Sequence, residues 1–277
     1  MNKATFFLGI SFFLLILGSC DKIEPPFKQT TSTNNDTSTY VQKVLIEDFT
    51  GHRCGNCPRA HEKLAQLQQF YGNKVIGLSI HSGFFAMPLP PTYSADYRTT
   101  EGNEITQAFG IQNYPSGMVN RTLYNGNLLL SHDNWSEAVN NLIQLQPSLG
   151  IKGNINFNTS NNTISATITT KILQTIEYPT KLCVYLSEDS IVSPQTDYSQ
   201  NPSTINNYVH MHMLRKSFNG TWGTEIPINS KQVGDTLIRS FSLNWDNSWQ
   251  KKNSHVIAFV YNANSNEIIQ VEKFKIP

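Results

Sequence analysis

The stretch that decides the fold is EDFTGHRCGNCPRAHEKL, residues 47–64. It places Cys54 and Cys57 two residues apart, where the apolar run KVLIEDF gives way to a helical pattern. A cysteine pair with this spacing serves in disulfide exchange, supplies half of a zinc site or forms a structural disulfide. The choice depends on the compartment of the chain and on the elements around the pair.

The first twenty residues indicate export. One positive charge at Lys3 precedes an apolar run over residues 4–17 and a small-residue exit, which predicts a signal peptide over residues 1–19. The run is shorter than the ~20 residues that span a bilayer. Leu-Gly-Ser-Cys at residues 17–20 resembles the bacterial lipobox, which implies that Cys20 is acylated (palmitate, for example) and anchors the chain to a membrane. The alternative is an ordinary secretory leader with an incidental cysteine.

Composition separates a tether from the folded part. Residues 20–40 hold hardly any apolar residue after Phe27, so we expect a lipidated, flexible tether there. The 277-residue chain carries a net charge of +1 and no run of Lys and Arg, which gives no reason to expect a nucleic-acid partner. No phosphate-binding or dinucleotide fingerprint occurs, so no cofactor is expected.

The compartment narrows the role of the cysteine pair. Disulfides persist in oxidising compartments, but a bond across two residues closes so small a ring that it would stabilise the fold only weakly. A structural zinc site needs four ligands. His210 and His212 lie about 150 residues away, on one face of a predicted strand, and are only weak candidates for a metal such as copper. Partly buried strand histidines are the alternative, and no metal is expected.

Residues 41–148 alternate strand-like and helix-like patterns. KVLIEDF and KVIGLSI are apolar strands, a Pro-rich insertion covers residues 83–100, and Asn125-Gly126 marks a hairpin turn. Helices are predicted after Cys57, at EITQAFG and from about residue 134, where Glu137 is placed to complete a cap. The predicted order is β-α-β-α-β-β-α.

Residues 149–277 follow a different pattern. Short strand-like runs are separated by turns rich in Asn, Ser, Gly and Pro, which predicts an all-β antiparallel sandwich as a second domain. The runs are GIKGNINF, TISATITTKI, KLCVYLSE, YVHMHML, DTLIRSFSL, HVIAFVYN and IIQVEKFKI. Cys183, in KLCVYLSE, is expected to be an inert residue packed in a sheet.

The order of elements in residues 41–148 resembles the minimal thioredoxin arrangement. The resemblance implies that Cys54 is an exposed nucleophile at the start of a helix, where unpaired N–H groups stabilise its thiolate. Cys57 would then close a Cys54–Cys57 disulfide and release the partner. Arg53 replaces the usual Trp, and its positive charge favours an oxidant or isomerase over a reductant.

Two further positions match the thioredoxin pattern. Asp48 stands six residues before Cys54, which implies a buried carboxyl that exchanges a proton with Cys57. The alternative is a strand-end cap. Pro115 stands where the family has a cis-proline, which implies that the backbone of Tyr114 pairs with an extended substrate segment. The alternative is an ordinary trans proline in a turn.

The whole chain resembles a Bacteroidetes outer-membrane lipoprotein family with an N-terminal thioredoxin-like domain and a C-terminal β domain. The residues that carry this resemblance are LGSC, FTGHRCGNCP, YPSG and YVHMHMLRKSFNGTWG. It implies a lipid-anchored protein of the outer membrane, on its periplasmic or cell-surface side. The leading hypothesis is a thiol–disulfide oxidoreductase that acts on exported proteins with thiols or disulfides. The alternative is a binding or adhesion lipoprotein in which the thioredoxin-like fold is only a scaffold.

Overall fold

Strand β1 (Val44–Thr50) lies between β2 (Val75–His81) and β3 (Ser116–Val119). It pairs in parallel with β2 and antiparallel with β3. Every residue of β1 and β2 is buried, because helices or other strands cover both faces. Strands that are buried on both faces have nearly continuous apolar sequences. The charged residues of β1 are Glu47 and Asp48.

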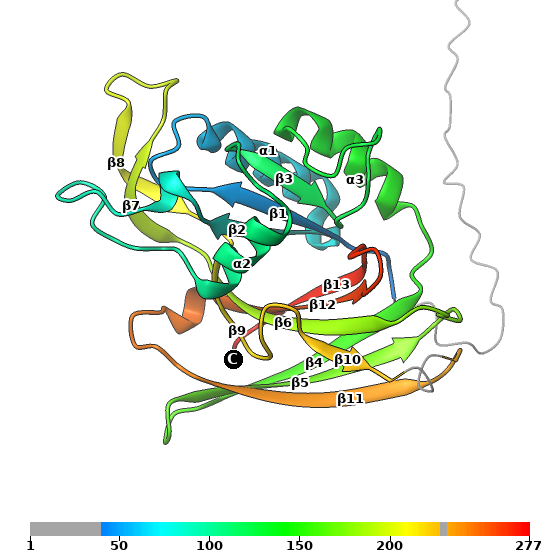
Figure 1. The fold of residues 1–277 in the computed structure, drawn as a ribbon. Coiled ribbons are helices and arrows are strands. Elements are labelled where there is room, and N and C mark those ends of the chain that lie inside the picture. Colours follow the sequence, from blue (N-terminus) through cyan, green and yellow to red (C-terminus); the bar gives the residue numbers. More distant parts are fainter. Residues whose placement is uncertain (1–39, 228–231) are drawn as a thin grey trace, which may run out of the picture. The chain divides into compact units, whose positions relative to one another are not determined.

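The computed structural model describes residues 40–227 and 232–277, which belong to one compact unit, Thr37–Pro277 (Figure 1). The predicted signal peptide, Cys20 and nearly all of the tether lie outside the described residues. The helices are α1 (Cys57–Tyr71), α2 (Thr100–Ala108) and α3 (Trp135–Ile143), with short 3-10 turns η2 (Gly72–Lys74), η3 (Phe84–Ala86), η4 (His132–Asn134) and η6 (Lys251–Asn253). The other strands are β4 (Leu149–Asn158), β5 (Thr163–Ile172), β6 (Thr180–Glu188), β7 (Ile191–Thr196), β8 (Thr204–His210), β9 (Met213–Ser217), β10 (Thr224–Ile226), β11 (Thr236–Asn244), β12 (Ser254–Asn262) and β13 (Ile268–Lys275).

Helices α1 and α3 cover one face of strands β1 to β3. The apolar spacing that predicts α1 is the spacing that the fold buries, and Gly72 ends the helix with a positive φ of 60°. The buried side chains of α1 are Cys57, Ala60, Leu64 and Leu67. The start of α3 differs from the prediction, because Glu137 accepts a hydrogen bond from the Tyr124 hydroxyl and Asn134 makes no side-chain cap.

A larger sheet extends beyond β1, β2 and β3. Over the described residues its order is β13-β12-β6-β9-β2-β1-β3, with β10 beside β6. The junction between β9 and β2 is short: Ser79 pairs with Met213, and the Ser79 N–H donates to the His212 carbonyl at 2.7 Å. Strands from residues 41–148 and from residues 149–277 therefore share one sheet.

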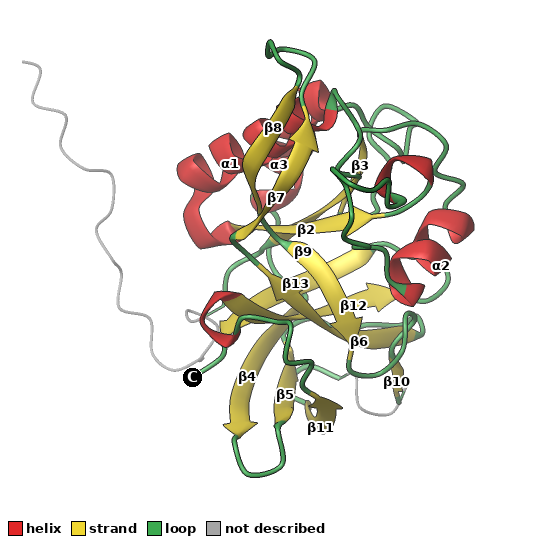
Figure 2. Cartoon of the chain, turned by 90° about the vertical axis from the view of Figure 1, so that its left-hand side faces the viewer, coloured by secondary structure: helices red, strands yellow, loops and turns green. Residues whose placement is uncertain are grey.

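Strands β4, β5 and β11 form a three-stranded sheet of their own (Figure 2). Its apolar face packs on one face of β6 and β12, through residues such as Ile164 and Ile168 against Val184 and Val256. The opposite face of β6 and β12 packs on β1, β2 and α2. The mixed α/β class is confirmed. The division at residue 148 and the separate sandwich stay predictions. Strands from both sides of residue 148 belong to one sheet.

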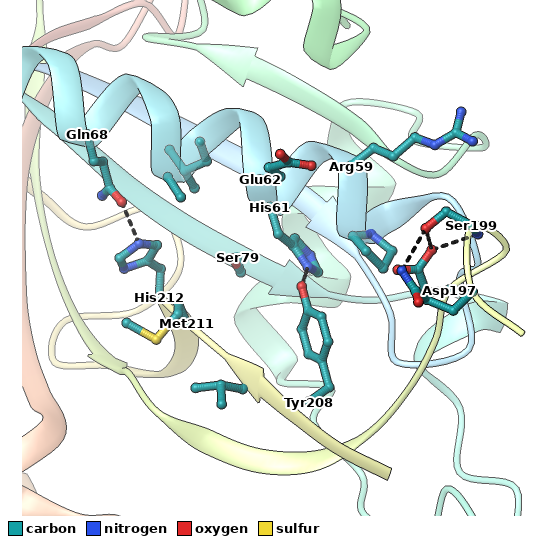
Figure 3. A pocket seen from close by; sticks show the side chains of 15 residues that line it. Arg59, His61, Glu62, Gln68, Ser79, Asp197, Ser199, Tyr208, Met211 and His212 are labelled. Atoms are coloured by element: carbon teal, nitrogen blue, oxygen red, sulfur yellow. Dashed lines mark hydrogen bonds between the residues drawn. The ribbon is translucent and has the colours of Figure 1, made fainter. Parts of the chain in front are cut away.

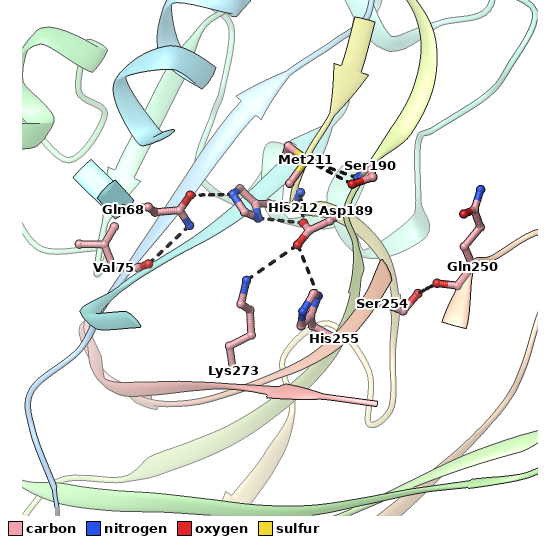
Figure 4. A network of polar contacts seen from close by, with 10 residues as sticks. All are labelled: Gln68, Val75, Asp189, Ser190, Met211, His212, Gln250, Ser254, His255 and Lys273. Carbon is pink, nitrogen blue, oxygen red and sulfur yellow. Dashed lines mark hydrogen bonds and ion pairs between the residues drawn. The ribbon is translucent and has the colours of Figure 1, made fainter. Parts of the chain in front are cut away.

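The predicted strand YVHMHML is two strands, because the chain turns between His210 and Met213. His212 takes a positive φ of 59°, and Asp189 accepts hydrogen bonds from its backbone N–H at 2.6 Å and from its ring Nδ1 at 2.9 Å. The other ring nitrogen lies 2.8 Å from the Gln68 side-chain oxygen (Figure 4). These contacts fix the base of an arm, β7 and β8, that projects between β6 and β9.

A buried ion pair lies where the two parts of the chain meet. The guanidinium of Arg121 donates to both carboxylate oxygens of Glu47, at 2.7 and 2.6 Å, and both side chains are within 1% of complete burial. The rings of Phe109, Phe259 and Tyr261 surround the guanidinium, 5.1–5.7 Å away. Arg121 thus contacts the residue that follows α2, as well as β12 and β1.

Substitution of Arg121 by Ala should lower the free energy of unfolding by about 3–5 kcal/mol, because it leaves the Glu47 carboxylate buried without a partner. The double substitution Glu47→Leu/Arg121→Met should cost less, since no charge then remains in the core. Denaturant unfolding of both proteins measures the difference. A loss below about 1 kcal/mol for Arg121→Ala would contradict this role.

Candidate functional site

The cysteine pair lies at the junction of β1 and α1. Cys54 and Cys57 form a disulfide with an S–S distance of 2.09 Å and a Cα–Cα distance of 5.4 Å. Cys57 is the first residue of α1, and Pro58 follows in the first turn, where its missing N–H costs nothing. The bond joins a loop to a helix start, the position that favours a thiolate when the bond opens.

Cys54 is only 2% exposed and Cys57 is fully buried. The prediction that the Cys54 sulfur is exposed is therefore wrong. The reason is the arm β7–β8, because residues 195–198, at the end of β7 and just after it, contact the loop that contains the pair. Nothing in the local sequence around Cys54 signals a cover that comes from about 140 residues further along the chain.

The arm pairs with the backbone of the cysteine loop. The N–H of Thr196 donates to the His52 carbonyl, and that of Tyr198 donates to the Gly55 carbonyl, both at 2.9 Å. The side chain of Gln195, fully buried, donates to the Cys54 carbonyl at 2.9 Å. A Cβ at residue 55 would lie 2.5 Å from the Tyr198 ring, so this close approach requires glycine there.

The insertion after β2 covers the other side of the loop. The Arg53 N–H donates to the Phe85 carbonyl at 3.0 Å, and a Cβ at Gly51 would lie 2.4 Å from the Phe85 backbone. The Arg53 guanidinium packs over the Phe84 ring at 4.6 Å and donates to the Met87 carbonyl at 3.2 Å. The positive charge of Arg53 thus lies beside the cysteine loop.

Asp48 is fully buried, and neither of its carboxylate oxygens has a hydrogen-bond partner among the described residues. Burial raises the pKa of this carboxyl from 3.8 to about 8. At neutral pH the group therefore holds its proton. A neutral buried carboxyl that loses its proton only near pH 8 can both give and accept a proton under ordinary conditions.

His61, on α1, lies against this carboxyl. Its Nε2 lies 3.4 Å from Asp48 Oδ2 and 2.9 Å from the Thr50 hydroxyl, and its Nδ1 lies 2.7 Å from the Tyr208 hydroxyl. Burial, and then the neighbouring His210 and His212, lower the pKa of His61 to about 3. The ring is therefore neutral at physiological pH. Nothing in the sequence around His61 signals this contact with Asp48.

Aromatic and imidazole rings fill the space between β2 and the arm. The His210 ring lies 5.5 Å from His81 and 4.9 Å from Tyr208, and His52 lies 5.2 Å from Tyr93. Burial lowers the pKa of His81 well below 6.5 and that of His210 to about 4. The cluster is therefore uncharged at neutral pH. His81 was predictable in part, because it ends β2 opposite Thr50 and so must lie beside the cysteine loop.

The other predicted residues are placed as follows. The Tyr114–Pro115 peptide bond is cis, directly before β3, while the Tyr114 hydroxyl lies 3.1 Å from that of Ser82. A role of this dipeptide in substrate binding stays a prediction. Cys183 is free and fully buried, and burial raises the pKa of its thiol to about 12, as expected of an inert residue.

His210 and His212 do not share a face, because the turn at His212 separates them. His210 contacts His81 and Tyr208, while His212 contacts Asp189. In the described part of the chain, no group of three or more His, Cys, Asp or Glu residues is arranged to hold a metal ion. The prediction that His210 and His212 lie on one face of a strand is therefore wrong.

A cavity of about 480 Å³ opens between α1 and β8 (Figure 3). His61 and Tyr208 line it from opposite sides, and Glu62, Gln68 and Asp197 add further polar groups. The imidazole that reaches Asp48 on one side therefore reaches this cavity on the other.

Comparisons with known proteins identify the family. The model of "Outer membrane protein Omp28" matches residues 102–277. The chain belongs to the Omp28 family. Membership confirms the predicted outer-membrane location. The matched residues begin within α2, so they leave out Cys54, Cys57 and Asp48. Lipidation of Cys20 stays a prediction, and no helix of the described residues is long and apolar enough to span a membrane.

Solved structures of low sequence identity share the fold. HBP35 of Porphyromonas gingivalis is 17% identical, with a TM-score of 0.64 over 86% of this chain and 76% of that one. AGR_C_4864 of Agrobacterium tumefaciens is 15% identical, with a TM-score of 0.52 over 85% of this chain and 95% of that one. A search of curated protein sequences finds no match. At such identities the likeness shows the fold alone.

Loosening the arm should speed up reduction of the buried disulfide. Tyr198→Ala removes the ring over Gly55, and Gln195→Ala removes side-chain hydrogen bonds to the cysteine loop. We expect each variant to be reduced by dithiothreitol several-fold faster than the wild type. Thiol labelling during the reaction measures the rate, and Phe70→Ala, at an exposed site on α1, is the control. Unchanged rates in both arm variants would show that the arm does not limit access.

Asp48→Asn should stabilise the protein, and increasingly so as the pH rises from 4 to 8. With its pKa raised to about 8, folded Asp48 retains a proton that the unfolded chain releases near pH 4, so stability falls over this window. The slope for one group approaches about 1.4 kcal/mol per pH unit. Denaturant unfolding at pH 5 and pH 8 measures the difference in the free energy of unfolding between variant and wild type. Asp133→Asn, at an exposed site, is the control. A difference in the free energy of unfolding that stays constant or narrows between pH 5 and pH 8 would contradict the raised pKa of Asp48.

Proposed function

We propose that this outer-membrane protein is a thiol–disulfide oxidoreductase that acts on exported proteins through Cys54 and Cys57. The observation that carries the proposal is a disulfide at a strand-to-helix junction, together with a fully buried Asp48 carboxyl on the preceding strand whose pKa is raised to about 8. A structural disulfide with so small a ring has no need of such a group.

We interpret residues 41–148 as a thioredoxin-like unit. The parallel pairing of β1 with β2, the antiparallel β3 and the cis peptide bond before Pro115 support this interpretation. In this arrangement Pro115 directly precedes Ser116, which pairs with Phe49 at the end of β1, so the dipeptide lies near the cysteine loop. Tyr114 would pair with an extended client segment at this edge.

Exchange proceeds by attack of a client thiolate on Cys54. The new client–Cys54 bond forms as the Cys54–Cys57 bond breaks, and the electron pair leaves on the Cys57 sulfur. Asp48 supplies the proton that neutralises this buried thiolate. A second client thiolate then breaks the mixed disulfide, so the client is oxidised and the protein holds two reduced cysteines. The reverse sequence reduces a client, and attack by reduced Cys54 followed by its release isomerises one.

The positive charge of Arg53, the residue before Cys54, supports the oxidising or isomerising direction. Arg53 would stabilise a Cys54 thiolate and hence the reduced pair, which makes the disulfide form the stronger oxidant. Burial of the disulfide requires that the arm β7–β8 move before a client can reach the sulfur. The strands of residues 149–277 would therefore control access.

The burial of the pair also supports a second candidate. A cysteine bond that is 2% and 0% exposed suits a protein whose thioredoxin-like part is a scaffold for binding or adhesion at the outer membrane. On this hypothesis the disulfide holds the loop in shape, and no client sulfur reaches it.

Insulin reduction and refolding of a reduced, disulfide-containing client distinguish the two. The full-length protein should accelerate one or both reactions, Cys54→Ser/Cys57→Ser should not, and Cys183→Ser should match the wild type because that thiol is buried and inert. Failure of the wild type to exceed the double variant in both assays would reject the oxidoreductase. Full complementation of a deletion strain by the double variant would favour the scaffold.

A further inference from the structure

The buried carboxyl of Asp48 needs a path for its proton. The group is fully buried, so bulk water cannot replace a proton that it has given to a sulfur. Among the described residues, His61 contacts both the carboxyl and the cavity between α1 and β8. This arrangement is an Asp–His–Tyr chain, with one member on β1, one on α1 and one on the arm.

We propose that His61 carries protons between Asp48 and this cavity, with Tyr208 as the residue that positions its ring. The proposal rests on the proposed function, because only a sulfur that changes protonation requires the path. It also gives the arm β7–β8 a second task beside covering the disulfide. The Tyr208 hydroxyl comes from β8, near the base of the arm, so the path stays complete when only the far end of the arm, around Tyr198, moves to admit a client.

The proton balance of the path is simple. When the Cys57 sulfur leaves and takes the proton of Asp48, His61 Nε2 gives a proton to the carboxylate. His61 Nδ1 takes one from the Tyr208 hydroxyl, and Tyr208 takes one from water in the cavity. The hydroxide left there is neutralised by the proton that the client thiol released to solvent when it became a thiolate. No electrons move along the chain, and each group ends neutral with the imidazole in its other tautomer. The Thr50 hydroxyl, 2.9 Å from Nε2, can accept from it before the step and donate to it afterwards.

The surroundings favour this neutral transfer over a stored imidazolium. The titratable groups around the ring come from several elements. Glu62 on α1 and Asp197, Tyr208 and His212 on the arm and its base line the same cavity, and His81 at the end of β2 and His210 on the arm lie close enough to act on its charge. Burial, and then His210 and His212, disfavour a charge on His61, and burial raises the pKa of the Tyr208 hydroxyl. A ring that holds one proton and lies between a donor and an acceptor transfers it by changing tautomer.

Chemical rescue tests the path. In His61→Ala the cavity opens onto Asp48, and imidazole added to the buffer can take the place of the missing ring. We expect His61→Ala to lower the rate of exchange between the disulfide and dithiothreitol at least ~10-fold at pH 7, and imidazole to restore most of it. Tyr208→Phe, which deletes one hydroxyl, should slow the reaction in the same direction. The reduction potential of the pair should not change, because the path alters a rate only.

Two controls separate this role from a structural one. Tyr71→Phe removes a hydroxyl from the same helix, and His132→Ala removes a histidine elsewhere; both should keep the wild-type rate and respond to imidazole no more than the wild type does. Wild-type rates in His61→Ala, or a loss that imidazole does not relieve, would overturn the path but leave the oxidoreductase intact. A wild type whose Cys54–Cys57 disulfide does not exchange with dithiothreitol unless denaturant is added would overturn both.

Discussion

One sheet serves both parts of the chain, and each part buries the apolar surface of the other. The side chains of β6 and β12 alternate, so that Val184 and Val256 face the three-stranded sheet while Tyr185 and Phe259 face β1, β2 and α2. Removal of either part would expose an apolar face to water, at about 25 cal/mol for each Å². The buried Glu47–Arg121 pair lies in the same region and adds a polar contact that tolerates little displacement.

This shared core decides where the arm lies. Strands β6 and β9 are neighbours in the sheet, so the chain that connects them, β7 and β8, must leave and return at adjacent points. Asp189 and His212 fix the direction at the base. The arm therefore reaches the cysteine loop with a defined register, and its tip makes backbone hydrogen bonds there. Access to the disulfide and the proton path from Asp48 both depend on this one placement.

Hydrophobic patterns in the sequence predicted the helices and strands that depend mainly on interactions between near neighbours in the chain. Apolar runs and helical spacing predicted β1, α1, β2, α2, β3 and α3, but of the hairpin expected around Asn125-Gly126 only β3 is a strand, and Leu130 forms an isolated bridge to Gly117. The roles of Asp48 and Pro115 stay predictions. The arm was not predictable, because the pairing of distant strands leaves no short-range signal in the sequence. The run YVHMHML looks like one strand, but it contains a turn at His212 that depends on contacts with Asp189. For the same reason the sequence did not reveal that the Cys54 sulfur is covered. His61 lies one turn beyond Cys57, but the proposed proton path requires Tyr208, which comes from a distant strand, so it could not be predicted from the sequence.

The most direct measurement is the reduction potential of the Cys54–Cys57 pair in the native protein, read by thiol labelling across a glutathione series. A reversible exchange pair beneath a movable arm should interconvert fully without unfolding and settle above about −300 mV, in the range of proteins that exchange disulfides with clients. A bond that stays closed until denaturant is added, or that settles below that potential, would contradict an exchange function and leave the disulfide as part of the scaffold.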